Sequence, residues 1–273
     1  MFEVNVPRPP PFVPVPLWLA EYGRAVMPES GPDAPDVGEL HAVAELRELA
    51  DLLAAVWGRA GEPPLSHETL RALSHAGAYV AGARRDGGLV GGLVGFLGRD
   101  PDGTPTLHSH VLGVLEGARA AGVGYALKQH QRRWALDREI GTVTWTFDPL
   151  VRRNARFNLV RLGAEAAAYH PDFYGEMDDA LNAGDPTDRL VVRWRVAAPR
   201  PPVEADVGSL LAGGAMVALR VGPRDEPQAL AGGAAVRLCQ VPEDIVAMRR
   251  DRPDMALAWR LALRSGLGGA LAE

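Results

Sequence analysis

The spacing of hydrophobic residues along the chain predicts helices and strands that together form a mixed α/β domain. Apolar residues that recur every three or four positions mark helices with one buried face, and short runs of β-branched and aromatic residues mark strands. The expected elements are helices over 39–57 and 66–75, strands over 78–84, 89–97 and 106–114, a helix from 123, a strand over 142–147, a helix over 152–162, and a strand pair over 165–170 and 189–196.

Both ends of the chain lie outside this domain of residues 38–196. Residues 1–37 are rich in proline, which excludes an ordinary helix and predicts an extended N-terminal arm. Such an arm packs on its own or a neighbouring subunit, or serves as a proline-motif ligand. After a proline-rich linker, residues 203–273 form a C-terminal extension. This extension is either a separate domain or a continuation of the sheet. Its expected elements are strands over 215–221 and 235–241 and a helix over 242–264 that is interrupted or bends near Pro253.

Composition excludes several classes of protein. The 273 residues are 47% hydrophobic and 23% charged, which is ordinary for a soluble globular chain. The net charge of −5 argues against non-specific nucleic-acid binding. No apolar run is long enough to span a bilayer, and the N-terminus lacks the pattern of a signal peptide. The single cysteine, Cys239, fits a reducing compartment as a buried thiol, so we expect a cytoplasmic protein with neither nucleic-acid nor membrane partners.

The strongest chemical signal lies in residues 107–134. A strand with two histidines leads into the glycine-rich turn Arg119-Ala120-Ala121-Gly122-Val123-Gly124, which opens an amphipathic helix. The first N–H groups of a helix lack partners and its dipole is positive there, so this turn can bind a phosphate. Alternatively, the two glycines only permit close strand–helix packing. The polar face of the helix is expected to carry Lys128, Gln131 and Arg132.

These residues resemble motif A of the GNAT superfamily of N-acetyltransferases. In that motif a strand ends in an aliphatic residue, here Val114, and R/Q-x-x-G-x-G/A opens a helix. The order of elements before the motif, and Asn154-Ala155 with Leu162-Gly163-Ala164 after it, are similar to the same superfamily. The resemblance covers residues 38–196 and implies a GNAT-like acyl-CoA fold.

A narrower resemblance is to a bacterial subgroup of predicted GNAT enzymes. Some members of that subgroup are associated with the N-succinylation of amino acids, which points to an acyl donor and an acceptor class. The segments that carry this resemblance are Val56-Trp57-Gly58, Thr146-Phe147-Asp148-Pro149, Arg153-Asn154-Ala155-Arg156-Phe157-Asn158, Tyr174-Gly175 and Thr187-Asp188-Arg189-Leu190.

The resemblance implies a cofactor, acetyl-CoA or another acyl-CoA such as succinyl-CoA. In the fold it resembles, the amides of residues 119–124 hold the CoA pyrophosphate, and the strand around Leu112, Gly113 and Val114 bonds the pantetheine through its backbone. Asn154 is expected beside the same cofactor. The scattered histidines His41, His67, His75, His130 and His170 have no metal-ligand spacing, so no metal is expected.

His108 and His110 are the candidate catalytic residues. They lie two apart on one expected strand, so both side chains point to one face. Histidine titrates near neutrality, which suits a base that deprotonates an ammonium. The run H-S-H-V-L-G-V is similar to the paired-histidine strand of serotonin N-acetyltransferase, which implies His110 as general base with His108 as its helper. The alternative is a pair of structural strand histidines.

The remaining catalytic groups are less well defined. The thioester oxygen would be polarised by a backbone amide, that of Val114. A proton donor for the leaving thiolate is not assigned. Members of the superfamily often have a tyrosine at the position occupied here by Leu159. The adjacent Asn158 is a candidate to hold a water there, and Tyr169 and Tyr174 are further candidates for the donor.

Five residues are candidates for substrate binding. Glu116 contacts the substrate ammonium or is simply solvated. Arg152 and Arg153 either form a fork that binds a carboxylate or are solvated residues at the start of a helix. Trp145 and Phe147 wall the acceptor pocket or belong to the core.

The sequence therefore predicts a CoA-dependent N-acyltransferase that moves an acetyl or succinyl group to the amine of a small molecule, such as an amino acid. The alternatives are a CoA-binding regulatory module without turnover and a protein N-acetyltransferase. The acceptor, the acyl chain and the oligomeric state, with a homodimer among the options, are not fixed by the sequence.

Overall fold

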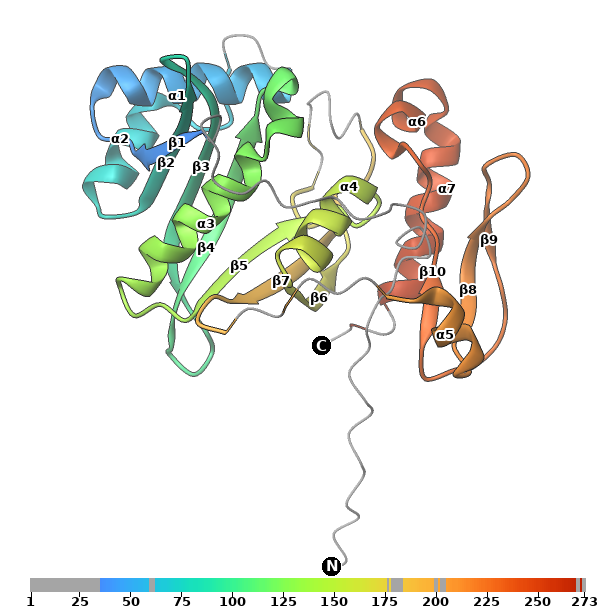
Figure 1. The fold of residues 1–273 in the computed structure, drawn as a ribbon. Helices are drawn as coiled ribbons and strands as arrows, with labels where there is room; N and C mark the ends of the chain where they lie inside the picture. Colours follow the sequence, from blue (N-terminus) through green and yellow to red (C-terminus); the bar gives the residue numbers. More distant parts are fainter. Residues whose placement is uncertain are drawn as a thin grey trace, which may run out of the picture.

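A computed structural model describes residues 35–58, 62–175, 177, 184–198, 201, 205–268 and 271 (Figure 1). The proline-rich arm up to residue 34 and most of the linker at 199–202 lie outside the described residues. The main body is a seven-stranded sheet in the order β1-β2-β3-β4-β5-β7-β6. Its strands are β1 (Asp36–Glu39), β2 (Tyr79–Arg85), β3 (Gly88–Arg99), β4 (Pro105–Val114), β5 (Thr142–Phe147), β6 (Glu165–His170) and β7 (Arg189–Arg195).

Helices cover both faces of this sheet. Helices α1 (Val43–Trp57) and α2 (His67–His75) bury leucines against Val80, Val94 and Val111 on one face. Helix α3 (Val123–Leu136) buries Leu127 and Trp134 against the other face. The alternation of side chains along each strand supplies both layers, so the mixed α/β architecture expected from the sequence is confirmed.

Local signals placed most of the elements correctly. Strand β5 has the expected bounds, and β6 and β7 form the expected antiparallel pair. Ser66 caps α2 by accepting a hydrogen bond from the backbone N–H of Thr69 at 3.3 Å. Asp86 and Gly87 have positive φ angles of 50° and 83°, as a two-residue hairpin turn requires.

The prediction of a helix from residue 39 and an arm up to residue 37 was wrong at their junction. Residues 36–39 form the edge strand β1, which pairs with β2, and the helix begins at Val43. The strand shows no apolar run, because its stability comes from backbone pairing and from Glu39, which accepts a hydrogen bond from Trp134 Nε1 at 2.9 Å. This partner is 95 residues away, so no local pattern reveals the strand.

The C-terminal extension forms a second, three-stranded sheet in the order β10-β8-β9, with helices beside it. A helix at 207–212 and a strand at 227–229 were not expected. The helix expected over 242–264 is interrupted at Arg252, next to Pro253 as predicted, and so forms two helices. The elements are α5 (Val207–Ala212), β8 (Met216–Val221), β9 (Pro227–Ala229), β10 (Arg237–Cys239), α6 (Ile245–Asp251) and α7 (Pro253–Leu263).

The extension shares its core with the main body. Buried Leu219, Leu238 and Trp259 belong to the same apolar cluster as Trp145 and Trp194 of the main sheet. Buried Cys239 is in this cluster too, and burial raises the pKa of its thiol to about 11. In the described part of the chain, no helix has the length and apolar character needed to cross a membrane.

Candidate active site

Strands β4 and β5 separate soon after they meet, and this splay creates the candidate site. They are the only parallel neighbours in the main sheet as described, and they pair at Leu107 with Val143 and at His108 with Thr144. Beyond His108 the edge of β4 has no partner in β5. Backbone groups on such an edge need other hydrogen-bond partners, which an extended ligand can provide.

A β-bulge in β4 coincides with the splay. Ser109 lies opposite Gly95 and Val111 lies opposite Val94, so His110 is the extra residue without a partner in β3. A Cβ atom on Gly95 would lie 2.9 Å from the carbonyl oxygen of His108, so only glycine fits there. Glycine in β3 thus permits the bulge that turns the histidine strand away from β5.

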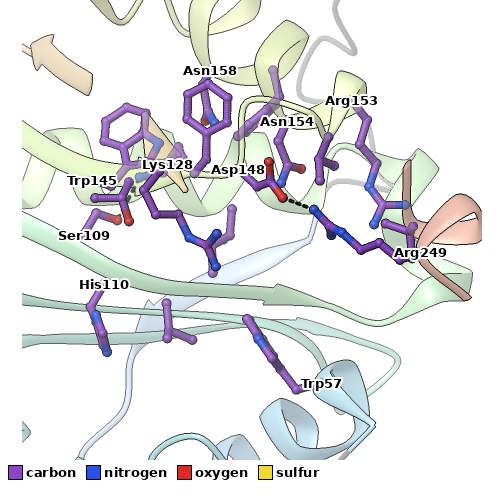
Figure 2. A pocket seen from close by; sticks show the side chains of 18 residues that line it. Trp57, Ser109, His110, Lys128, Trp145, Asp148, Arg153, Asn154, Asn158 and Arg249 are labelled. Atoms are coloured by element: carbon purple, nitrogen blue, oxygen red, sulfur yellow. Dashed lines mark hydrogen bonds and ion pairs between the residues drawn. The ribbon is translucent and has the colours of Figure 1, made fainter. Parts of the chain in front are cut away.

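A cavity of about 240 Å³ opens in this splay (Figure 2). Its walls come from β4, β5, α3, the short helix α4 (Arg152–Ala155), the following π-helical turn η3 (Arg156–Arg161) and α6. The lining residues are Trp57, Ser109, His110, Val111, Leu112, Lys128, Trp145, Thr146, Phe147, Asp148, Val151, Arg153, Asn154, Phe157, Asn158, Arg189, Val246 and Arg249.

The expected cofactor residues surround the open end of the splay. Residues 116–121 form a 3-10 helix, Gly122 adopts φ 74°, and α3 begins at Val123. The first amides of α3 have no partner one turn earlier in that helix, as an anion site requires. A Cβ on Gly124 would meet side chains of Leu112, Val114 and Phe157 at 3.8 Å, so this glycine leaves a gap between α3 and β4.

These features fit a diphosphate with an extended arm. The positive end of α3 suits the diphosphate, and the unpaired edge of β4 suits a chain that bonds like a strand. Leu112 and Asn154 line the cavity, whereas Gly113, Val114 and residues 119–124 lie outside its lining. The described residues include no group of three His, Cys, Asp or Glu side chains placed to hold a metal ion.

His108 and His110 lie on one face of β4, as predicted. Their ring centroids are 6.1 Å apart, and both rings flank Phe96 of β3, at 5.1 and 5.6 Å. Only His110 lines the cavity, while His108 Nδ1 lies 3.3 Å from the hydroxyl of Thr144. The bulge therefore keeps both rings together and turns one of them into the site.

Burial keeps this pair neutral. It lowers the pKa of His108 to about 4, with further contributions from the charges of His110 and Lys128. Burial also lowers the pKa of His110. Both imidazoles are unprotonated at pH 7 and can accept a proton. If one of them is the catalytic base, activity should be lost on acidification only below pH 6.5, the ordinary histidine value.

The prediction that Lys128 and Gln131 lie on a polar helix face was wrong. Both are fully buried under the sheet, with exposed fractions of 2% and 0%. Lys128 Nζ donates to Ser109 Oγ at 2.8 Å and to Gln131 Oε1 at 3.3 Å, and it lies 3.8 Å from the centre of the Trp145 ring. The sequence contained a sign of this burial. Gly124 and Ala135 lie on the same helix face as Lys128 and Gln131, and their small side chains allow that face to pack closely against the sheet.

The candidate substrate residues separate into three groups. Trp145 and Phe147 are buried and line the cavity, so they belong to both the core and its wall. Arg153 is exposed and lines the cavity, whereas Arg152 lines a different cavity between α4 and α6, so the two do not form a fork. Glu116 is 92% exposed and lies 3.8 Å from Arg119, outside the cavity.

Neither of the two tyrosines that are candidate proton donors lines the cavity. Tyr169 donates a 2.5 Å hydrogen bond to Asp188, and burial together with this bond raises its pKa. Tyr174 bonds Thr146 at 3.2 Å from outside the lining, and Leu159 has no proton to give. Asn158, the candidate for holding a water, is buried and lines the cavity.

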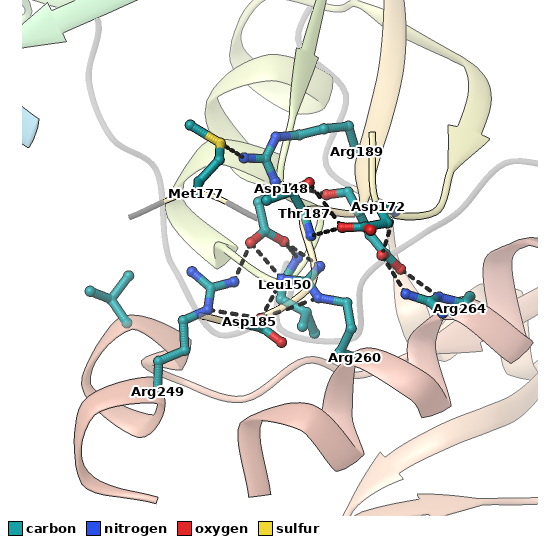
Figure 3. A network of polar contacts seen from close by, with 12 residues as sticks. Asp148, Leu150, Asp172, Met177, Asp185, Thr187, Arg189, Arg249, Arg260 and Arg264 are labelled. Carbon is teal, nitrogen blue, oxygen red and sulfur yellow. Dashed lines mark hydrogen bonds and ion pairs between the residues drawn. The ribbon is translucent and has the colours of Figure 1, made fainter. Parts of the chain in front are cut away.

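Sequence reasoning missed the part of the wall that comes from the C-terminal extension. Val246 and Arg249 of α6 line the cavity. Arg249 pairs with Asp148 at the end of β5 and with Asp185, at 2.9 Å for the latter (Figure 3). Asp148 and Arg249 are 101 residues apart in the sequence, so no motif could show that they meet.

Comparison with known proteins agrees with this architecture. Residues 42–163 match the model of the acetyltransferase (GNAT) family. A protein assigned as an acetyltransferase in Acinetobacter baylyi ADP1 has a TM-score of 0.50 at 15% identity, over 63% of this chain and 97% of that one. No curated protein matches the sequence.

Two further solved structures are named for different substrates. The ribosomal-protein-S18-alanine N-acetyltransferase of Escherichia coli gives a TM-score of 0.47 at 14% identity, over 62% of this chain and 98% of that one. Aminoglycoside 6′-acetyltransferase type Ii gives 0.48 at 19% identity, over 61% and 99%. At such low identities the likeness concerns the fold alone. The chain therefore has the GNAT acetyltransferase fold, with residues 42–163 matching that family.

Proposed function

We propose that this protein is a CoA-dependent N-acyltransferase that acylates the amine of a small molecule, with amino acids as the preferred class. The observation that carries the proposal is the splay of β4 and β5 around a cavity. This cavity is lined by a neutral histidine, and the N-terminus of α3 lies next to it, at Gly124.

Backbone groups would bind the acyl-CoA. The first amides of α3, after Gly122, would hold the pyrophosphate, and the edge of β4 at Leu112 would bond the pantetheine. The bound acyl-CoA supplies an acyl group that its thioester has already activated. Because backbone N–H groups would make these bonds, the important feature at Gly122 and Gly124 is that neither residue has a side chain to block the cofactor.

His110 is the group that would take the proton from the amine. Its ring lines the cavity, and it is exposed on the opposite side, so it can pass the proton to water. His108 lies beside it on the same face, with Thr144 as a hydrogen-bond partner. A neutral imidazole in this position typically accelerates such a step by about 10²–10⁴-fold.

Arg153 supports an acceptor or an acyl group that carries a carboxylate. Its exposed side chain reaches the cavity, and among the described residues it has no ion-pair partner. A guanidinium binds a carboxylate through two parallel hydrogen bonds. An amino acid acceptor and a succinyl donor both provide this group, so both agree with the position of Arg153.

The test is thiol release from acetyl-CoA and succinyl-CoA, measured in parallel with a panel of amines, amino acids and their methyl esters. We expect release with free amino acids and less with the esters, which lack the carboxylate. Binding of CoA without release by any acceptor would contradict the proposal and favour a regulatory module, which Leu159 in place of a tyrosine also favours. Release with peptides alone would favour a protein N-acetyltransferase.

A further inference from the structure

Lys128 is a buried titratable group that the proposed function leaves unused. It is the only lysine in the sequence, and it lines the candidate cavity. Its partners are the hydroxyl of Ser109, the amide oxygen of Gln131 and the ring of Trp145. Among the described residues, no carboxylate forms an ion pair with it.

This position is costly for a cation. Burial without a counter-ion disfavours an ammonium group, and a leucine or methionine would fill the same space without that cost. A lysine also differs from the many arginines of this chain in one chemical respect, because it can release its proton near neutrality when it is buried. The site therefore contains a group that is poor for stability and suited to proton transfer.

Ser109 and His110 approach the cavity from opposite faces of β4. Ser109 points to α3 and bonds Lys128, whereas His110 points to the other face and stacks on Phe96 (Figure 2). Both residues line the cavity, because the bulge and the splay open it to the two faces. A base on the solvent side and an acid on the buried side would meet at the same reacting centre.

Acyl transfer from a thioester to an amine needs both groups. Once the amine is neutral, the N–C bond forms and the C–S bond breaks, so the nitrogen loses one proton and the sulfur gains one. His110 accounts for the first proton under the proposed function. Tyr169 and Tyr174 lie outside the cavity, and Leu159 has no proton to give, so the second proton lacks a donor.

We propose that Ser109 and Lys128 are this donor, an inference that rests on the proposed function. The Ser109 hydroxyl gives its proton to the leaving sulfur and receives one from the Lys128 ammonium along their 2.8 Å hydrogen bond. Lys128 is then a neutral amine, which regains a proton from solvent after the products leave. Ser109 is the catalytic residue, and Lys128 acts through it.

The electrostatics of the cavity agree with this role. Burial lowers the pKa of Lys128 to about 7, so its proton is available at neutral pH. Gln131, the partner on its own helix, is uncharged. The titratable or charged groups that face the cavity from other elements are His110, Asp148, Arg153, Arg189 and Arg249. His108 lies beside His110, and the charge of Lys128 contributes to its lowered pKa. Since the donor must be protonated and His110 unprotonated, activity should fall above about pH 7 and again at acidic pH.

Because there is one lysine, NMR can follow it directly. Protein grown with [ε-¹³C]lysine gives one side-chain signal, which we would titrate with pH in the free protein, with CoA and with desulfo-CoA, which lacks the sulfur. We expect the titration midpoint to rise on binding CoA, because a thiolate stabilises the ammonium, and to stay near its free value with desulfo-CoA. Equal midpoints with both ligands would overturn the proposal. Failure to bind either ligand would instead refute the proposed function.

Variants test the same step by rate. Lys128→Met fills the space without charge, and Lys128→Arg keeps the charge but holds its proton at neutral pH. We expect both to lower kcat about 100-fold and to lose the decline in rate above pH 7, and Ser109→Ala to lower kcat similarly.

Arg133→Met removes a cation from the exposed side of the same helix and should leave the profile unchanged. Since Lys128→Met removes a buried cation, its Tm should not fall, which separates lost catalysis from unfolding. A retained basic limb in Lys128→Met would overturn the proposal.

Discussion

The two walls of the cavity are built in different ways. The wall formed by β4 and the start of α3 depends on backbone geometry that neighbouring residues produce, namely a bulge opposite Gly95 and a helix start after Gly122. The wall near α6 depends on buried charges that come from distant parts of the chain. Arg249 and Arg260 converge on Asp148 and Asp185, and all four side chains are buried (Figure 3).

The difference predicts how each wall tolerates change. Backbone-made features are sensitive to added side chains but have little influence on global stability. A buried ion network has the opposite property, because removal of one partner leaves the others charged and desolvated. Each region can therefore be disrupted in a way that leaves the other intact, and the four changes below should separate stability from binding and catalysis.

The largest effect is expected from Asp148→Asn. Burial raises the pKa of Asp148, but hydrogen bonds and charges from Arg260 and Arg249 outweigh it and lower the pKa overall. Loss of this charge should reduce the free energy of unfolding by about 3–5 kcal/mol, measured by urea denaturation. The matched control is Asp251→Asn, which breaks an exposed pair with Arg250 and should leave the free energy of unfolding nearly unchanged.

The same change has a pH signature with a definite sign. A carboxyl whose folded pKa lies below its unfolded value stabilises the protein above that unfolded value, about 3.9. This contribution is lost as the pH falls towards the lower folded pKa. The wild-type protein should therefore lose stability below about pH 4 more steeply than Asp148→Asn. Parallel acid-unfolding curves for the two proteins would contradict a charged Asp148 at the centre of the network.

His110→Gln should affect catalysis and leave the network intact. We expect a fall in kcat of about 100-fold, without a change in urea midpoint. Since burial lowers the pKa of His110, the acidic decline of the wild-type rate should begin below pH 6.5, and this acidic limb should be absent in the variant. His170→Gln, at a histidine outside the cavity, is the control. An unchanged acidic limb would show that another group accepts the proton.

Gly124→Glu should weaken CoA binding by about tenfold or more, because it places bulk and negative charge at the start of α3. A Cβ atom at Gly124 would meet no neighbour closer than 3.8 Å, so we expect little change in Tm. Gly141→Glu, at a glycine with open space around it, should bind CoA like the wild type. Calorimetry with CoA measures both. A Tm loss with unchanged CoA affinity would make this glycine a packing residue only.

The smallest effect is expected from Arg153→Gln, at the rim between the two walls. The KM for an acceptor or donor with a carboxylate should rise about fivefold to tenfold, the worth of one exposed charged hydrogen bond. The KM for a methyl ester acceptor with acetyl-CoA should not change. Equal effects on both acceptors would show that Arg153 does not recognise the carboxylate.

The sequence by itself determined the main elements, the glycine-rich start of α3 and the paired histidines. These features follow from periodicity, turn chemistry and strand alternation, which are local. The resemblance to GNAT enzymes, which the same segment carries, indicated the correct fold.

Tertiary structure alone decided which charged side chains are buried and which reach the cavity. The sequence pattern predicts Lys128 on a polar helix face, but the sheet buries it. The pattern also offers Arg152 and Arg153 as a fork, but they line different cavities. Arg249 reaches the wall from 101 residues beyond Asp148. Burial and long-range ion pairing depend on how elements pack in three dimensions, and a linear pattern of residue types does not contain that information.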